Sequence, residues 1–152
     1  MTRSNYKGTK EEVRALSAYV KLVRASETIA SRIQRHVTEA GLSVSQFGVL
    51  EALYHLGPLS QASIAKKVLK STGNITMVID NLEKRSLVKR ERQQDDRRFY
   101  SVQLTAEGKK LIGSIFPRHA ALIVAEMGIL SSAEQEELGH LCRKLGLRKK
   151  GE

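Results

Sequence analysis

The stretch Ser60–Thr105 reads SQASIAKKVLKSTGNITMVIDNLEKRSLVKRERQQDDRRFYSVQLT and decides the fold that we expect. It contains, in order, a short helix signal at 60–68, a second helix signal at 71–82, and two basic extended runs at 88–93 and 99–104 joined through residues 95–98. Two helices followed by a charged β-hairpin are the element order of a winged helix-turn-helix. Such modules insert one helix into the DNA major groove and place a basic arm on the backbone or in the minor groove. DNA binding is therefore the leading hypothesis.

Long helices are predicted on both sides of this stretch. Apolar residues recur at helical spacing over Lys10–Ala40, before Gly41, and again after Thr105 and after Ser131 or Ser132. Pro117 should kink or split the helix that follows Thr105. We expect a mainly α fold with one β-hairpin: a single unit over 1–152, a winged module at 43–104, and a helical dimerisation lobe formed by 10–41 and 105–147. A two-fold dimer would present two recognition helices to a palindromic operator.

Charge and composition agree with a nucleic-acid partner. The chain carries a net charge of +10, and residues 60–105 hold ten Lys/Arg against five Asp/Glu, a net +5. A basic balance favours an anionic partner, although a merely solvated basic surface gives the same numbers. The polar N-terminus lacks the apolar core of a signal peptide, and no apolar run approaches the ~20 residues that span a bilayer. With a single cysteine, Cys142, these features predict a cytoplasmic protein with no membrane segment.

The second helix of the motif has a readable polar face. With Ile75 at the centre of the buried side, Val78, Ile79 and Leu82 lie near it, and the opposite side is polar. Asparagine can bond adenine, threonine can contact a thymine methyl, and Gly73 permits close backbone approach. In the hairpin, Asp96 can hold Arg98 while arginines reach phosphates or a narrow minor groove. The DNA-binding residues that we predict are Ser71, Thr72, Gly73, Asn74, Thr76, Met77, Lys84, Arg90, Arg92, Asp96, Arg97 and Arg98.

Three segments carry a resemblance to the MarR family of transcriptional regulators. Leu42–Phe47 opens the second helix as in that family, and Leu82–Val88 resembles the end of its recognition helix, with Ser86 where many members have glycine. The most specific match is Asp96–Gly108, which fits the family's D-x-R-x5-L-T-x-x-G signature. The resemblance implies a homodimer that usually represses nearby genes and is released by a small ligand or by oxidation.

The resemblance also implies a ligand site between the dimerisation lobe and the winged module. The candidate residues are Tyr19, Phe47, Glu51, Tyr54 and His119. A carboxylate, a histidine and aromatic rings would suit a phenol or a quinone-like ligand, and a weaker similarity to the quinone-responsive branch of the family favours the same class. Oxidation of Cys142 is the alternative switch, but a cysteine in an apolar stripe is more often an inert core residue.

Other function classes have less support in the sequence. The four histidines are scattered over different predicted helices, and no phosphate-cradling glycine loop or nucleophile–base motif is present. We therefore predict neither enzymatic activity, nor a cofactor, nor a metal site. A winged helix can also serve as a protein-interaction module without operator binding, and this remains the principal alternative to the DNA-binding regulator.

Overall fold

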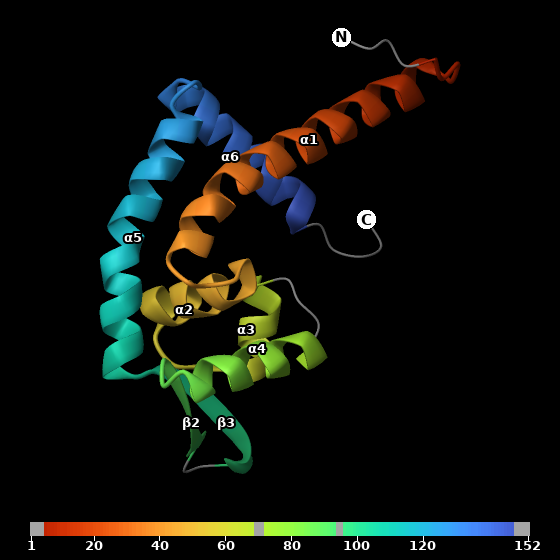
Figure 1. Ribbon diagram of the computed structural model, residues 1–152. Coiled ribbons are helices and arrows are strands. Elements are labelled where there is room, and N and C mark those ends of the chain that lie inside the picture. The colour runs from red at the N-terminus through yellow and green to blue at the C-terminus, as the bar shows by residue number, and fades with distance from the viewer. Residues whose placement is uncertain (1–4, 69–71, 94–95, 148–152) are drawn as a thin grey trace. The chain divides into compact units, whose positions relative to one another are not determined.

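The computed structural model describes residues 5–68, 72–93 and 96–147. Its elements are α1 (Lys10–Glu39), α2 (Val44–Leu56), β1 (Leu59–Ser60), α3 (Gln61–Val68), α4 (Thr72–Lys84), β2 (Val88–Gln93), β3 (Asp96–Leu104), α5 (Ala106–Met127) and α6 (Ser132–Gly146) (Figure 1). The predicted fold class, mainly helical with a small antiparallel sheet, is confirmed. The chain divides into two compact units, Met1–Val44 and Ser45–Glu152.

Local sequence signals fix both ends of α1 in the first unit. Thr9 caps the helix: its side chain accepts from the backbone N–H of Glu12, and the Glu12 carboxylate accepts from the backbone N–H of Thr9. This reciprocal capping box satisfies donors that the first turn leaves open. At the other end Gly41 takes φ 78°, a left-handed conformation that favours glycine, and the helix stops where the sequence predicts.

The core of the second unit joins the helices and the hairpin of the winged module to α5. The largest fully buried side chains come from α2, α3, α4, β2, β3 and α5: Val49, Leu50, Ile64, Ile75, Ile79, Leu82, Val88, Val102 and Ile112. Burying each such side chain contributes about 1.5–3 kcal/mol. The recognition helix α4 supplies three of these residues, and the predicted buried side of α4 is therefore confirmed, with Val78 half-buried at its edge.

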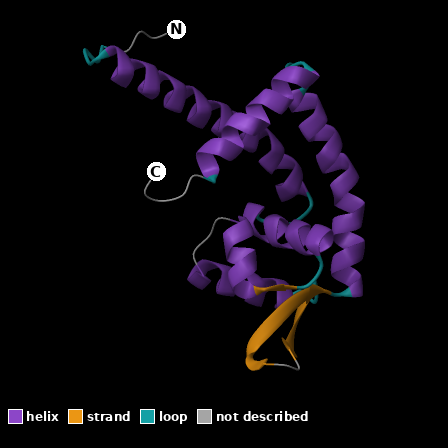
Figure 2. Cartoon of the chain, turned by 180° about the vertical axis from the view of Figure 1, so that it is seen from behind, coloured by secondary structure: helices purple, strands orange, loops and turns teal. Residues whose placement is uncertain are grey.

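The sheet has three strands rather than the predicted two, in the order β1-β3-β2. The short β1 pairs antiparallel with β3 through Leu59↔Val102 and Ser60↔Ser101. A two-residue strand is too short to show alternation in the sequence, which is why sequence analysis missed it. Beyond this base, the β2–β3 hairpin projects past the helices of the module (Figures 1 and 2).

The hairpin ladder becomes irregular toward its tip. Arg92 pairs with Tyr100, but the next pair is Gln93↔Asp96, so residues 97–99 of β3 have no partner in β2. We expected residues 95–98 to form a connecting loop, and the structure corrects this: β3 already begins at Asp96. Extra residues in one strand bend it and increase its twist, which sets the tip of the hairpin apart from its base.

The turn after α4 is built without glycine. Ser86 adopts φ 59°, the backbone N–H of Leu87 donates to the Leu82 carbonyl at 3.0 Å, and the N–H of Ser86 donates to the Glu83 carbonyl at 2.9 Å. The first of these bonds is the long-range bond of a Schellman-type helix end. The left-handed turn at this position therefore forms with serine, at the conformational cost that glycine avoids.

Helix α5 starts against that turn. The Thr105 hydroxyl donates to the Ser86 carbonyl at 2.6 Å and accepts from the N–H of Gly108 at 3.0 Å, while the Thr105 N–H donates to the Leu87 carbonyl at 3.1 Å. A Cβ on Gly108 would lie 1.9 Å from the Leu87 carbonyl oxygen. Only glycine permits this close approach, and it fixes the start of α5 on the end of α4.

Pro117 was expected to kink or split this helix, and the structure excludes the split: α5 continues through Pro117 as one 22-residue helix. Pro117 lies on an exposed side, and the buried Ile112 and Ile115 anchor the preceding turns. The following helix, α6, turns back at 101° to α5, and none of its residues is buried. Within the described residues, no helix alone has the length and apolar character to span a bilayer; the bent pair α5–α6 meets these criteria only when taken together.

Candidate functional site

Helix α4 presents one continuous exposed face. Its exposed residues with spacings of three and four are Asn74, Met77, Asn81 and Lys84, which we call the reading stripe. At about 100° per residue these four lie within roughly 80° of arc, opposite the buried Ile75 and Ile79. Met77 is 65% exposed, although it is a large apolar side chain on a helix whose other side is buried. The reading stripe therefore offers amide, thioether and ammonium groups on a helix that the core holds rigidly.

Thr76 lies beside the reading stripe and is half-buried. Its hydroxyl accepts a hydrogen bond from the side-chain amide of Gln61, the first residue of α3. This bond ties the start of the first helix of the motif to the recognition helix. Thr76 was predicted to contact DNA; the structure shows that its hydroxyl also takes part in holding the two helices together.

An ion-pair cluster fastens the hairpin to α4. The guanidinium of Arg90, on β2, bonds Asp80 Oδ1 at 2.7 Å through Nη2 and Glu83 Oε1 at 3.2 Å through Nη1. Glu83 Oε2 also accepts from the backbone N–H of Arg90 at 3.2 Å. We call these three residues the wing clamp. Because β2 is an edge strand, the backbone N–H of Arg90 has no neighbouring strand to bond, and the Glu83 carboxylate of the recognition helix accepts from it instead.

The remaining described cations of β2 differ in their surroundings. Lys89 pairs with Glu91 at 3.3 Å on the exposed face of the strand. Arg92 has a different partner: its Nε donates to the Tyr100 hydroxyl at 3.0 Å, and its guanidinium carbon lies 5.4 Å from the centre of that ring. Among the described side chains, no carboxylate forms a salt bridge with Arg92. Among the described side chains, the partner of its guanidinium is therefore the neutral Tyr100.

The predicted DNA-binding residues fall into distinct groups. Asn74, Met77 and Lys84 are exposed on the reading stripe, and Arg92 is exposed on the hairpin. Arg90 is only 20% exposed and belongs to the wing clamp. Ser71 lies outside the described residues, and for Thr72, Gly73, Asp96, Arg97 and Arg98 only the backbone is described.

Three side chains that organise this surface were not singled out from the sequence: Gln61, Glu83 and Tyr100. Each is polar or amphipathic, and from the sequence alone each would be expected to point into solvent without a specific partner. The only available signal was the alternation in the hairpin, which places Tyr100 opposite Arg92 across the two strands. Their roles depend on partners 7 to 15 positions away along the chain, which local patterns do not reveal.

A second set of candidates meets where α2 lies against α5. Phe47 contacts His119 with ring centres 4.6 Å apart, and Phe116 lies 5.8 Å from His119, 4.5 Å from His55 and 6.0 Å from Tyr54. We call these five side chains the ring cluster. Phe47 is buried, whereas Tyr54 and His55 are exposed, so the ring cluster runs from the core to the surface. The tilted and edge-on geometries are those that aromatic pairs prefer.

The ring cluster unites three of the five predicted ligand residues, Phe47, Tyr54 and His119, and adds Phe116 at its centre. Glu51 is half-buried one turn after Phe47 on the same helix. Tyr19 is 63% exposed on α1, in the other unit, and is described with that helix alone. In the sequence Phe116 is one of several apolar residues at helical spacing after Thr105; its central place in the ring cluster depends on the contacts with α2.

Cys142 is exposed on α6, together with Leu138, Leu141 and Leu145. We expected this cysteine to be an inert core residue, and within the single chain it is not in the core. The four residues lie on one face of α6 by their spacing of three, four and seven. An apolar face of this kind on a helix with no buried residue requires a cover from outside the helix.

Taken together, a helix-turn-helix with an exposed reading face and a β-hairpin joined to that helix defines the winged helix-turn-helix class of transcriptional regulators. The chain belongs to the MarR family. The family model matches residues 42–99. Over 137 residues the chain is 36% identical to the HTH-type transcriptional regulator MhqR of Bacillus subtilis, a match that covers 90% of this chain and 94% of that protein.

Solved structures with the same fold include two of particular relevance. One describes how DNA binding by BpsR of Bordetella bronchiseptica is regulated by 6-hydroxynicotinic acid; it is 27% identical, with a TM-score of 0.76 over 86% of this chain and 98% of that one. The other is Sco3205, a MarR family transcriptional regulator of Streptomyces coelicolor in complex with DNA. It is 21% identical, with a TM-score of 0.82 over 97% of this chain and 95% of that one.

Proposed function

We propose that this chain acts as a homodimeric repressor that binds a palindromic DNA operator and is released by a small aromatic ligand. The observation that carries the DNA-binding part is the reading stripe, exposed on a recognition helix to which the hairpin is fastened by the wing clamp. The similarity in fold to Sco3205 in complex with DNA supports it. A protein-interaction module has no comparable need for a basic, rigidly connected helix and hairpin.

The contacts divide into base reading and backbone positioning. Thr72, Gly73, Asn74 and Met77 belong to the N-terminal half of the recognition helix, the part that approaches base edges in this motif. Ser71, which lies outside the described residues, is proposed to contact DNA with them. On the hairpin, Arg92, Arg97 and Arg98 contact phosphates or the minor groove, and Asp96 orients Arg98 for this contact. Lys84 at the other end of α4 adds a phosphate contact.

Arg90 receives a different role from the one first expected. Its guanidinium already has two carboxylate partners, so contacting a phosphate would require breaking charge-assisted hydrogen bonds. We assign it the positioning of the hairpin relative to the recognition helix. Arg92, which Tyr100 holds without neutralising it, is the described hairpin cation that is ready for a phosphate.

Dimerisation would cover apolar faces that each unit leaves exposed. In the first unit Leu16, Tyr19 and Leu22 of α1 are 40–63% exposed; in the second, α6 exposes Leu141 and Leu145. Exposed leucines at helical spacing are the pattern of a helix that packs on a partner. A Leu141→Asp, Leu145→Asp variant should be monomeric in sedimentation equilibrium, with the exposed Lys144→Asp as a control for the added charge. A variant that remains dimeric would place the dimer interface elsewhere.

The ring cluster supports the ligand class. Aromatic side chains with imidazoles and the nearby Glu51 match a small hydroxylated aromatic compound, a phenol or a quinone-like molecule. BpsR, similar in fold, responds to a hydroxylated aromatic acid. A thermal-shift series of phenolic acids, catechols and quinones tests this assignment. Stabilisation should be lost in Phe116→Leu and His119→Ala, and retained in the Cys142→Ser variant, which separates ligand binding from thiol oxidation.

The DNA-binding proposal is tested with a duplex that carries the site the protein itself selects from a random-sequence library. Affinity should fall about 10³–10⁵-fold between 50 and 200 mM salt for a dimer that makes 6–10 phosphate contacts. Arg92→Gln should weaken selected and shuffled duplexes alike and flatten the salt dependence, whereas Asn74→Ala should relax base preference by ~1–3 kcal/mol at one position of each half-site. Failure to select any sequence, or salt-independent binding, would overturn the proposal.

A further inference from the structure

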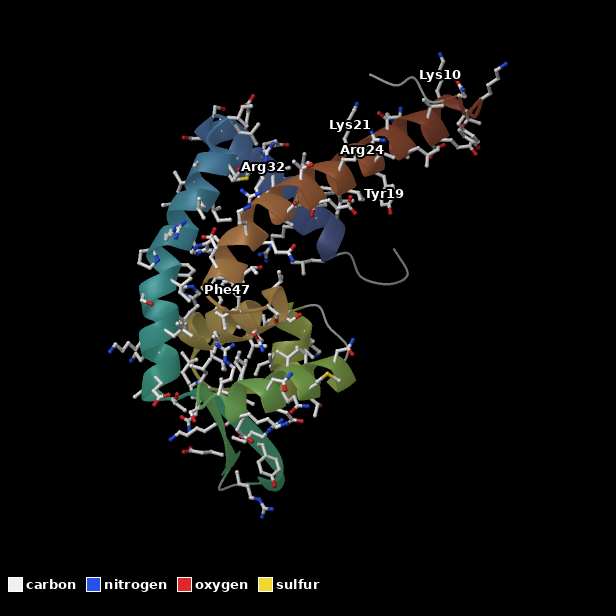
Figure 3. All side chains as sticks on the ribbon, viewed as in Figure 1. Lys10, Tyr19, Lys21, Arg24, Arg32 and Phe47 are labelled. Carbon is white, nitrogen blue, oxygen red and sulfur yellow. The ribbon has the colours of Figure 1, made fainter. Side chains whose placement is uncertain are left out.

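The cations of α1 form one continuous stripe. At about 100° per residue, all six lysines and arginines of the helix fall within roughly 40° of the line through Lys10. This basic stripe consists of Lys10, Arg14, Lys21, Arg24, Arg32 and Arg35, all exposed. In Figure 3, Lys10 and Lys21 extend from the side of α1 opposite to Tyr19. The stripe is about 37 Å long at the rise of roughly 1.5 Å per residue of an α-helix.

The other charges of α1 are kept off the stripe. Glu11, Glu12 and Glu27 project from other sides of the helix, and Glu12 is engaged in the cap with Thr9. Glu39 returns to the line of the stripe only after its last cation. Between Lys10 and Arg35 no acidic residue interrupts the stripe, and the other residues on this line are small and polar.

This arrangement is not what helix stability alone would favour. The pairs Lys10–Arg14, Lys21–Arg24 and Arg32–Arg35 are separated by three or four residues, so like charges face each other and disfavour the helix. A solvated helix face usually alternates the signs of its charges. A stripe of one sign along the whole length instead matches a partner with the opposite charge.

The stripe also has no part in the proposed dimer. It lies about 180° from Tyr19 and Val37, so covering the apolar face of α1 leaves the cations exposed. The stripe belongs to the unit Met1–Val44, whereas the hairpin belongs to the unit Ser45–Glu152.

We propose that the basic stripe is a second, sequence-independent binding surface for the phosphate backbone of duplex DNA. Duplex DNA carries one negative charge per about 1.7 Å of its axis and is a straight, regular polyanion on this length scale. The stripe matches about one turn of the duplex, roughly 34–36 Å. The phosphates wind around the duplex, so a straight row of cations laid along the axis meets both strands within one turn, without deforming either partner.

The same observations disfavour an anionic membrane. Helices that lie on membranes insert an apolar face flanked by their cations, so that both contact the lipid together. On α1 the apolar residues lie opposite the stripe, so the two faces cannot reach one bilayer surface. A protein partner would need acidic groups along about 37 Å of a straight line, which a folded surface seldom provides; both partners are outcomes of the test below.

A sandwich experiment tests the inference on the full chain. The selected-site duplex is immobilised and saturated with protein, and a labelled 40-bp duplex of shuffled sequence is then added. The stripe variant replaces Lys10, Lys21 and Arg24 by glutamine, which keeps the side-chain stem and the helix propensity. The matched control replaces Arg118, Arg143 and Lys144, which are exposed on α5 and α6, and so removes the same charge.

The wild type and the control should capture the second duplex, while the stripe variant should bind it about tenfold or more weakly. The slope of log affinity against log salt concentration should be smaller by about 2 to 3 for the stripe variant. The stripe variant and the control should both bind the selected site as tightly as the wild type does. A charge-preserving variant, Lys10→Arg with Lys21→Arg and Arg24→Lys, should also behave like the wild type, which separates charge from folding. Equal capture by the stripe variant and the control would overturn the inference.

Two further measurements separate this inference from the proposed function. Arg92→Gln should weaken the selected and the shuffled duplex alike, and adding the stripe substitutions to it should weaken binding to the shuffled duplex further. If no site can be selected, the difference in salt slope on the shuffled duplex between the stripe variant and the control still tests the stripe. Stripe-dependent binding to phosphatidylglycerol vesicles without stripe-dependent DNA binding would refute the DNA assignment, as would stripe-dependent retention on polyglutamate alone.

Discussion

Replacing Gly108 by alanine should uncouple α5 from the recognition helix. The new methyl carbon would lie 1.9 Å from the Leu87 carbonyl oxygen and 2.9 Å from its carbonyl carbon. A relaxed carbon–oxygen contact is about 3.3 Å, so the backbones must separate by more than about 1 Å. Both obstructing atoms belong to the main chain, so no side-chain rotation relieves the contact.

The magnitude follows from what this separation breaks. Thr105 bonds the Leu87 carbonyl at 3.1 Å and the Ser86 carbonyl at 2.6 Å, and both bonds bridge the same gap. Two hydrogen bonds at about 1 kcal/mol each, with about 1–3 kcal/mol for overpacking, are offset by the ~1 kcal/mol by which alanine favours a helix. Gly108→Ala should therefore lower the free energy of unfolding by about 2–4 kcal/mol.

Urea unfolding followed by circular dichroism measures this change. The matched control is Gly113→Ala in the same helix, where an added Cβ would meet only the Tyr54 hydroxyl, at 3.8 Å. That variant should be stabilised by about 0.5–1 kcal/mol, because glycine inside a helix is entropically costly. If Gly108→Ala is as stable as the wild type, the close packing of α5 on the end of α4 does not hold, and the reasoning fails.

The remaining predictions concern the hairpin and the turn before it. Arg90→Met should lower the free energy of unfolding by about 1–2 kcal/mol and weaken DNA binding, and a double-mutant cycle with Asp80→Asn should show coupling; additive effects would dismiss the wing clamp. Ser86→Gly should raise the free energy of unfolding by about 0.5–1 kcal/mol in the same urea titration, since glycine relieves the left-handed strain; an unchanged midpoint would contradict this. Tyr100→Phe should leave the melting temperature nearly unchanged but weaken binding to shuffled DNA a few-fold by releasing Arg92, and no such loss should appear when Arg92 is already glutamine.

Much of the architecture was predictable because it is recorded in local patterns. The 3.6-residue spacing of Ile75, Ile79 and Leu82 identified the buried side of α4, and Gly41 marked the end of α1. These signals depend on residues within one or two turns of each other, so a single sequence is sufficient to read them. The Asp96–Gly108 signature then connected the pattern to its family.

The site was only partly predictable, since charge and polarity do not reveal a partner. Arg90 and Arg92 are two residues apart on one strand and look equivalent in the sequence. One is held by two carboxylates of α4 and the other by a phenol across the hairpin. By its sequence pattern Phe116 is likewise one apolar residue of α5 among several; the fold brings Tyr54 and His55 of α2 beside it.

The order of the helices and the hairpin, the buried face of α4, the family and the basic face of α1 can be read from the sequence alone, since each is a property of neighbouring residues along the chain. Folding is needed to show that β1 joins the sheet, that Arg90 fastens the hairpin to the recognition helix, and that Gly108 is pressed against the Leu87 carbonyl. These features form between residues separated by 7 to 43 positions. Contacts over such separations exist only after the chain has folded, when packing selects one partner for each side chain among many of similar chemistry.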